Sequence, residues 1–255
     1  MILYFSGTGN SRYVAELLAE ELGEEKAPID IATAPANIDT DHEQIIWVFP
    51  IYSWGVPPVV LRYMESVEIS GSWRHWMVCT CGDDIGLAHN QWRKVVTERG
   101  WDAGGTFSVT MPNTYTLMRG FDVDPDDVTR QKLRAASPRV KEIAVCMMQG
   151  REPDDVTKGR FAKIKTKLIY PWFVKHAMSP KPFHSTDGCT GCGTCARNCP
   201  LQNIAMTDDR PSWSENCALC LRCYHICPTH SVAYGRATKG KGQYIFSQKF
   251  LSSDS

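Results

Sequence analysis

The chain has 255 residues, 43% of them hydrophobic and 22% charged, which is typical of a globular protein with one large domain or two small ones. Its 28 basic and 28 acidic residues give a net charge of zero, so no overall field draws it toward nucleic acid or anionic lipid. No apolar run approaches the ~18 residues of a membrane span, and a predicted strand already begins at Ile2. We therefore expect no membrane span, no signal peptide, no nucleic-acid partner and a cytoplasmic location.

The first 150 residues alternate predicted strands with predicted helices. Strands are expected at residues 2–5, 26–32, 45–50, 76–82 and 105–111, the second being the weakest, and helices at 11–22, 59–67, 86–99 and 125–148. Asp124 is the expected N-cap of the last helix, with Pro125 at its first position. This alternation predicts an α/β fold, a doubly wound parallel sheet, in a domain spanning 1–150.

A basic connector is predicted at 151–183, where eight Lys and Arg residues face three Asp and Glu. Phe161, Ile164 and Leu168 recur at helical spacing. The pattern favours a connector helix that docks this apolar side on a domain and leaves its lysines in water. The alternative interpretation is a basic landing patch for an acidic redox partner.

Eight of the eleven cysteines lie in a second predicted domain, 184–235, which is an internal repeat. CTGCGTCARNCPLQNIA at 189–205 returns as CALCLRCYHICPTHSVA at 217–233, so a small α+β fold with approximate two-fold symmetry is expected. A basic, then polar, C-terminal tail follows at 236–255.

Each half of the repeat has the spacing C-x2-C-x2-C-x3-C-P, which is typical of bacterial iron–sulfur proteins. Three thiolates two residues apart curl round one 4Fe-4S cluster, and the fourth reaches the other cluster. The predicted metal ligands are Cys189, Cys192, Cys195 and Cys227 for one cluster, and Cys217, Cys220, Cys223 and Cys199 for the other. Zinc sites draw on cysteine pairs separated by a longer loop, which does not fit this spacing. The segment resembles the two-cluster bacterial ferredoxins.

The first predicted strand runs into the loop SGTGNS, which offers hydroxyl groups at Ser6, Thr8 and Ser11 and backbone N–H groups at a helix N-terminus. These groups suit a phosphate monoester without a bound metal. The loop has no Walker lysine and no GxGxxG motif.

Two further loops follow the third and fourth main strands, at the edge where doubly wound sheets bind ligands. The first, PIYSWGVPP, presents Tyr52 and Trp54, and an exposed aromatic ring there suits stacking on a flat ligand. The second, CTCGDDIG, contains Gly82, which permits close approach of a ligand's polar edge.

With these three loops, residues 1–150 resemble the flavodoxin family, which implies FMN and the strand order 2-1-3-4-5. By this resemblance the cofactor-binding residues are Ser6, Gly7, Thr8, Gly9, Asn10 and Ser11 around the phosphate, Tyr52, Ser53, Trp54 and Gly55 beside the isoalloxazine, and Cys81, Gly82 and Asp83 at its pyrimidine edge. Ile85 and Gly86 stand where flavodoxins commonly carry a second aromatic residue. The exposed flavin face is therefore open toward the clusters, a substrate, or Asn113 and Tyr115.

The order of the two domains resembles fused flavodoxin–ferredoxin proteins of anaerobic microbes (EFR type). The two predicted domains together indicate an electron-transfer iron–sulfur flavoprotein, which links one-electron and two-electron carriers through FMN and two 4Fe-4S clusters. We expect an unidentified redox protein as its partner. Two alternatives stay open: a flavin-dependent reductase of a quinone or nitro compound fed through the clusters, and a redox-sensing binding module. No side chain is expected to act as a nucleophile or general base.

Overall fold

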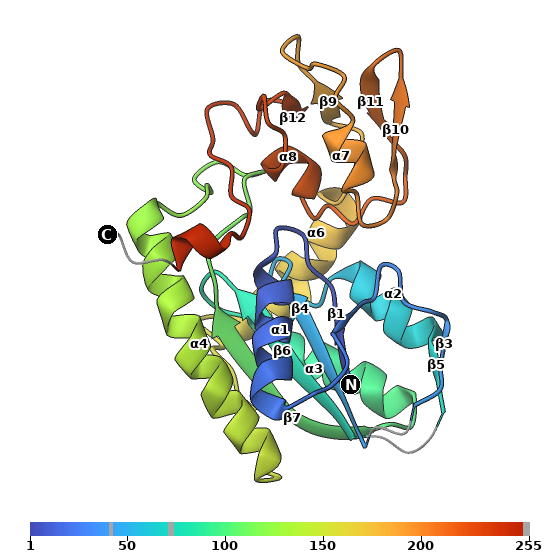
Figure 1. Cartoon of the computed structure of the whole chain (residues 1–255), viewed down its shortest axis with the longest axis vertical. Coiled ribbons are helices and arrows are strands. Elements are labelled where there is room, and N and C mark those ends of the chain that lie inside the picture. Colours follow the sequence, from blue (N-terminus) through green and yellow to red (C-terminus); the bar gives the residue numbers. More distant parts are fainter. Residues whose placement is uncertain (41–42, 71–73, 252–255) are drawn as a thin grey trace.

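The computed structural model describes residues 1–40, 43–70 and 74–251. Its centre is a parallel sheet in the order β2-β1-β4-β6-β7-β8 (Figure 1). The strands are β1 (Ile2–Tyr4), β2 (Ile29–Asp30), β4 (Gln44–Pro50), β6 (Arg74–Cys81), β7 (Asp102–Thr110) and β8 (Asp154–Asp155). Because the five predicted strands stand in the order 2-1-3-4-5, the doubly wound sheet is confirmed. The short strands β3 (Asn37–Ile38) and β5 (Glu68–Ile69) form a separate parallel pair.

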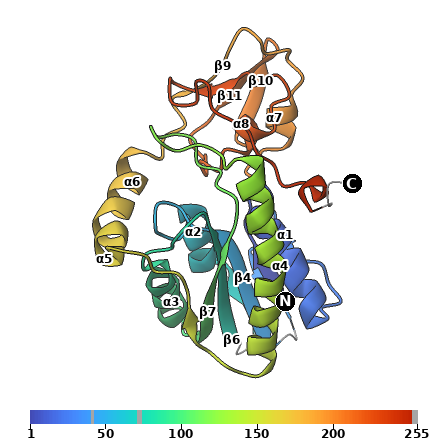
Figure 2. The same ribbon diagram turned by 90° about the vertical axis from the view of Figure 1, so that its left-hand side faces the viewer.

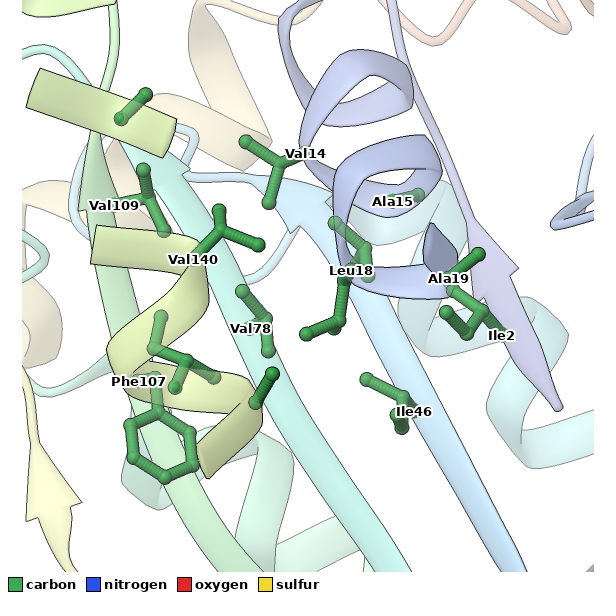
Figure 3. Packing of buried hydrophobic residues seen from close by; sticks show 14 of the residues in the cluster. Ile2, Val14, Ala15, Leu18, Ala19, Ile46, Val78, Phe107, Val109 and Val140 are labelled. Carbon is green, nitrogen blue, oxygen red and sulfur yellow. The ribbon is translucent and has the colours of Figure 1, made fainter. Parts of the chain in front are cut away.

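Helices cover both faces of this sheet. Helices α1 (Asn10–Leu22) and α4 (Asp126–Met148) pack on one face, and α2 (Pro58–Ser66) and α3 (Ala88–Glu98) on the other. Side chains alternate along each strand, so Ile46 and Val78 meet Leu18 on the α1 side (Figure 3), whereas Trp47 and Met77 belong to the opposite core. Strands buried on both faces explain the continuous apolar runs in the sequence.

Helix α4 begins at Asp126 with Pro125 at its N-cap, so Asp124 is not the cap that the sequence predicted. The Asp124 carboxylate accepts hydrogen bonds from the Asn113 N–H at 2.9 Å and from Lys132 Nζ at 2.7 Å. A mostly buried cation and a backbone donor therefore hold this carboxylate away from the helix end. The aspartate ties the loop after β7 to α4.

The cysteine-rich segment forms a small second layer over the carboxyl ends of the main strands (Figures 1 and 2). Its elements are two antiparallel strand pairs and two one-turn helices: β9 (Phe183–Ser185) with β12 (Val232–Tyr234), β10 (Ile204–Thr207) with β11 (Arg210–Trp213), α7 (Thr194–Arg197) and α8 (Arg222–His225). The two helices occupy equivalent positions of the sequence repeat, so the repeat is also structural. A separate apolar core includes Phe183, Leu219 and Val232.

The connector contains one continuous helical rod: α5 (Ala162–Ile164), the π-helical turn η1 (Lys165–Ile169) and α6 (Tyr170–His176). It runs along the outer side of the molecule toward the cysteine-rich segment (Figure 2). Thr166, Tyr170 and Phe173 are its buried side chains. The predicted docking side is therefore wrong, because Phe161, Ile164 and Leu168 point to solvent.

The C-terminal tail returns to the first domain and ends in a short 3-10 helix, η2 (Gln248–Phe250), beside α4 (Figure 1). The Phe246 N–H donates to the Thr8 carbonyl oxygen at 2.8 Å, and its ring stacks on Tyr13 with centroids 4.2 Å apart. Nothing in the tail's sequence signals this contact. Among the described residues, no helix is long and apolar enough to cross a membrane.

Candidate functional site

Two adjoining cavities lie where the loops after β1, β4, β6 and β7 meet the cysteine-rich segment. The larger encloses about 1000 Å³ of empty space including its open mouth, and the smaller about 530 Å³. Of the residues predicted to bind the cofactor, eleven line these cavities: Ser6, Gly7, Thr8, Asn10, Ser11, Tyr52, Ser53, Trp54, Cys81, Gly82 and Asp83. Gly9 and Gly55 stand outside, against Phe246 and Tyr170 respectively. The fold thus brings three loops that are distant in the sequence to one edge of the sheet.

The SGTGNS loop enters α1 through Gly9, whose φ of 102° is a conformation that glycine adopts readily. Inside the loop, the Gly9 N–H donates to Ser6 Oγ at 3.1 Å, and Ser11 Oγ bonds Thr80 Oγ1 at 2.8 Å. The Asn10 side chain is also engaged, since its amide donates to the Pro112 carbonyl and its oxygen accepts from the Tyr244 hydroxyl. The loop is held by these bonds around a helix N-terminus, where backbone N–H groups favour an anion.

Side chains of the connector hold the Trp54 loop in position. Ser53 and Trp54 have φ values of 44° and 64°, left-handed conformations that cost energy for residues with a Cβ. Thr166 Oγ1 donates to the Trp54 carbonyl at 2.8 Å and accepts from the Leu87 N–H at 2.7 Å. Lys165 Nζ lies 4.9 Å from the Trp54 ring centroid. These contacts offset the strain and fix one wall of the cavity.

The Gly82 loop is anchored from two sides. Lys132 Nζ donates to the Gly82 carbonyl at 3.1 Å, and Lys165 pairs with Asp84 at 2.6 Å, both cations being largely buried. Burial raises the pKa of the Cys81 thiol to about 12, so the group stays protonated and uncharged. The loop is therefore held in place at the edge of the cavity, with an uncharged thiol at Cys81.

Seven of the eight repeat cysteines have neighbours that agree with the predicted grouping. Cys199 lies within electrostatic reach of Cys217, Cys220 and Cys223. Cys195 lies within reach of Cys189 and Cys227.

The assignment of four ligands to each cluster stays a prediction, and all eleven cysteines of the chain are free thiols. Backbone N–H groups of Asn203, Leu219 and Ser231 donate to three of the sulfurs at 3.2–3.3 Å, bonds that favour a thiolate.

Cys220 lines both cavities, whereas Cys192 is exposed. A Cβ built on Gly7 lies 2.5 Å from the Cys220 carbonyl oxygen, so the two domains are in backbone contact there. Arg222 Nε donates to the Gly7 carbonyl at 2.6 Å, and another of its nitrogens donates to the Ser6 carbonyl at 2.7 Å. The guanidinium thus clamps the SGTGNS loop to the cysteine-rich segment.

His225 adds a second clamp between the cysteine-rich segment and the first domain. It is 4% exposed, its Nε2 bonds the Thr114 carbonyl at 2.8 Å, and its Nδ1 accepts from the Tyr244 N–H at 3.2 Å. Burial lowers the pKa of His225 to about 4, which keeps the ring neutral with its proton on Nε2. One imidazole therefore ties together the loop after β7, α8 and the tail.

The two halves of the repeat differ at three positions that lie at this interface, and these differences are visible in the sequence. Gly191 and Gly193 of the first half, both with φ of 68°, correspond to Leu219 and Leu221 of the second, with φ of 52° and 60°. Thr194 likewise corresponds to Arg222. Leucines are strained in this conformation, yet both are buried and line the larger cavity. Sites where the two halves differ mark the side that meets the first domain.

The residues present fit both expected cofactors. The cavities join a helix N-terminus to an aromatic wall and a glycine edge, as a phosphate attached to a flat ring requires. Across the described ranges, no three His, Cys, Asp or Glu side chains converge on a single-ion site. A cubane bonds each thiolate through a different iron, so its ligands stand further apart than those of one ion. The eight free thiols of the cysteine-rich segment match that donor chemistry.

Comparison with protein families agrees with this geometry. Residues 1–102 match the family model of a flavodoxin domain, and residues 188–232 match that of a 4Fe-4S dicluster domain. The chain is a flavodoxin–ferredoxin fusion. The first domain implies FMN and the second implies two iron–sulfur clusters, so this is an FMN and iron–sulfur redox protein.

Several solved structures resemble a part of this chain. A flavodoxin from Streptococcus pneumoniae TIGR4 is 14% identical, covers 56% of this chain and 96% of its own, and has a TM-score of 0.37. The Trp repressor binding protein of Bacillus subtilis is 16% identical over 55% and 96%, with a TM-score of 0.35. An NAD(P)H:quinone oxidoreductase of Methanothermobacter marburgensis is 12% identical over 56% and 94%, with a TM-score of 0.35. These scores add nothing to the family assignment. A search among curated proteins finds no match.

Proposed function

We propose that this protein is an electron-transfer iron–sulfur flavoprotein that passes electrons between FMN and two 4Fe-4S clusters. The observation that carries the proposal is the position of Cys220, which belongs to one thiol group and also lines both cavities. When bound, FMN exchanges electrons singly or in pairs and each cluster exchanges one at a time, so the chain links one-electron with two-electron carriers.

We assign Cys199, Cys217, Cys220 and Cys223 to the inner cluster and Cys189, Cys192, Cys195 and Cys227 to the outer one. The SGTGNS, Trp54 and Gly82 loops are the proposed FMN ligands. Because Cys192 is exposed, the outer group offers the entry point for a redox protein, and the inner group offers the exit toward the flavin. Arg222 and His225 hold the inner group against the cavity.

The four units proposed from the sequence are consistent with separate cores: a flavodoxin-like domain at 1–150, a connector at 151–183, a ferredoxin-like domain at 184–235 and a tail at 236–255. The sheet has its own two cores, and the cysteine-rich segment has a third. The connector and the tail both make contacts with the loops of the first domain. Their proposed role is to fix the position of one domain on the other.

The proposal is tested with Cys199→Ala and Cys227→Ala, each of which removes the fourth ligand of one cluster. Each variant should retain FMN and lose one of two cluster signals in electron paramagnetic resonance. Reduction of FMN by a reduced ferredoxin, followed by stopped-flow absorbance, should slow at least about tenfold in both. Cys146→Ala, which changes a buried thiol outside both groups, serves as the control. Unchanged FMN reduction in a cluster-deficient variant would contradict the proposal.

A second candidate is a flavin-dependent reductase of a small acceptor such as a quinone or nitro compound. It is favoured by the larger cavity, which is lined by Tyr52, Asn113 and Tyr115 and flanked by Met118 and Phe121, 47% and 40% exposed. Apolar and aromatic groups around an open mouth suit a flat organic acceptor. Turnover of a quinone and nitroarene panel with reduced ferredoxin would support this candidate. Absence of turnover across the panel would leave the carrier function.

A further inference from the structure

The outward face of the connector rod carries an exposed apolar stripe. Phe161, Ile164, Leu168 and Trp172 follow one another at intervals of three, four and four residues, and they are 67%, 50%, 67% and 57% exposed. The buried side chains Thr166, Tyr170 and Phe173 occupy the opposite face. Single exposed apolar residues are ordinary, whereas a continuous row of large ones marks an interaction surface.

All acidic or basic side chains of the connector from Val156 onward are basic, and the Asp84 carboxylate that approaches the rod is paired with Lys165. The exposed basic side chains beside the stripe are Lys158, Arg160, Lys163, Lys167 and Lys175. The sequence contains no Asp or Glu from Val156 to Thr186. The chain therefore has a local basic surface although its net charge is zero. The electric field near this rod attracts anions, whereas the molecule as a whole has no net attraction for them.

We propose that this face docks on an anionic membrane surface, with the apolar stripe in the headgroup region and the lysines at the lipid phosphates. An amphipathic rod with Trp, Phe, Leu and Ile on one face and lysines beside them has the composition of an interfacial helix. Basic clusters next to such a face add electrostatic attraction to anionic lipid.

Two observations favour lipid over a protein partner. Four of the five flanking cations are lysines, and protein interfaces are depleted of lysine and enriched in arginine. The rod that carries the stripe also runs along the outer side of the molecule (Figure 2), and a fluid surface accommodates an exposed rod without a matching groove. Charge complementarity and shape therefore point to the same occupant.

The docking would place the flavin cavity close to the membrane. Phe173 lines the larger cavity from the inward face of the rod, and Thr166 holds the Trp54 loop from the same face. The membrane face and the cavity wall are thus two sides of one helix, separated by roughly 10 Å, the diameter of a helix.

Vesicle co-sedimentation of the FMN- and cluster-loaded protein tests the proposal. Vesicles of phosphatidylcholine with phosphatidylglycerol should bind the protein at low salt, and pure phosphatidylcholine vesicles should bind it at least about tenfold more weakly. High salt should weaken the binding. The double variants Leu168→Asp/Trp172→Asp and Lys163→Glu/Lys167→Glu should each reduce binding about tenfold or more.

Met148→Asp is the matched control, because Met148 is 62% exposed on α4, far from the rod in the sequence, and its variant should bind as the wild type does. FMN and iron contents equal to the wild type show that the variants are folded. Equal binding to neutral and anionic vesicles overturns the proposal, as does unchanged binding of the Leu168→Asp/Trp172→Asp variant. A dimer or an acidic protein complex that depends on the stripe, without vesicle binding, assigns the face to a protein and overturns it too.

Discussion

Gly7 and Cys220 are in backbone contact, and a Cβ built on Gly7 would fall 2.5 Å from the Cys220 carbonyl oxygen. Gly7 belongs to the loop that offers a phosphate site, and Cys220 belongs to the inner thiol group. The backbones of Gly7 and Cys220 therefore lie directly between the proposed FMN site and the proposed inner cluster. The absence of a side chain at Gly7 is what permits this approach.

Gly7→Ala is expected to separate the two domains locally. The methyl group must displace backbone atoms of the other domain, at a cost of about 1–3 kcal/mol of unfolding free energy. Electron exchange between the inner cluster and FMN should slow, measured by stopped-flow absorbance of the loaded protein. Gly23→Ala is the contrast, since Gly23 has φ of 67° but no atom within 4 Å of the place that an added methyl group would take. That variant should lose stability and keep its electron-transfer rate; equal slowing of both would refute the role of contact.

Arg222→Thr replaces the clamp with the residue found at the equivalent position, 194, of the first half-repeat. Two hydrogen bonds from a guanidinium to the Ser6 and Gly7 carbonyls are lost, which should cost about 2–4 kcal/mol. Thermal unfolding of the loaded protein measures this loss, and FMN reduction through the clusters should slow. Arg197→Thr, on exposed α7, is the control and should change neither. An Arg222 variant with wild-type stability and transfer rate would show that the clamp is dispensable.

Thr166→Val tests whether the connector supports the flavin site. Valine has the same shape but can neither donate to the Trp54 carbonyl nor accept from the Leu87 N–H, which should cost about 1–3 kcal/mol. With the strained loop released, FMN should bind several-fold more weakly, as measured by titration of the flavin-free protein. Thr97→Val, on the exposed face of α3, provides the comparison. Unchanged FMN affinity in Thr166→Val would mean that the loop holds its own conformation.

His75 should make the stability of the first domain depend on pH. The ring is fully buried, its Nδ1 accepts from Trp47 Nε1 at 2.9 Å, and it stacks on Trp101. Burial lowers the pKa of His75 to about 4, while the nearby Asp102 opposes this shift. Because the folded pKa lies below the unfolded value of about 6.5, the unfolded chain binds the proton first as the pH falls.

The His75 contribution is therefore complete above about pH 6.5 and declines as the pH falls toward 4. Between pH 7 and pH 5 the wild type should lose about 2 kcal/mol through this group. His75→Gln keeps an acceptor for Trp47 and should lack this component of the pH dependence in urea unfolding followed by tryptophan fluorescence. His184→Gln, which changes an exposed histidine, should behave as the wild type. Parallel pH profiles for wild type and His75→Gln would contradict the assignment.

Some features of the site are local in sequence, and these were predictable. The cysteine spacing defines two groups of ligands because three thiols two residues apart lie on one loop. The SGTGNS loop follows a buried strand, and strand ends of a parallel sheet meet at one edge. The alternation of apolar runs with amphipathic helices likewise predicted the doubly wound sheet.

Other features were not predictable, because they join segments that the chain separates widely. Arg222 on the Ser6 and Gly7 carbonyls and Phe246 on Thr8 are contacts of this kind. His225 is another case, since its neighbours in sequence say nothing of the loop after β7 that covers it. The connector carries two apolar stripes, and periodicity alone cannot tell which one docks.

By itself, the sequence determined the fold class and the two kinds of cofactor domain, because each depends on residues within one strand, one turn or one short repeat. Only the tertiary structure decided that Cys220 lines both cavities and that Phe161, Ile164 and Leu168 remain in solvent. Such choices depend on shape and hydrogen-bonding partners supplied by distant segments, at Gly7, Trp54 and Thr114, and no local pattern contains them.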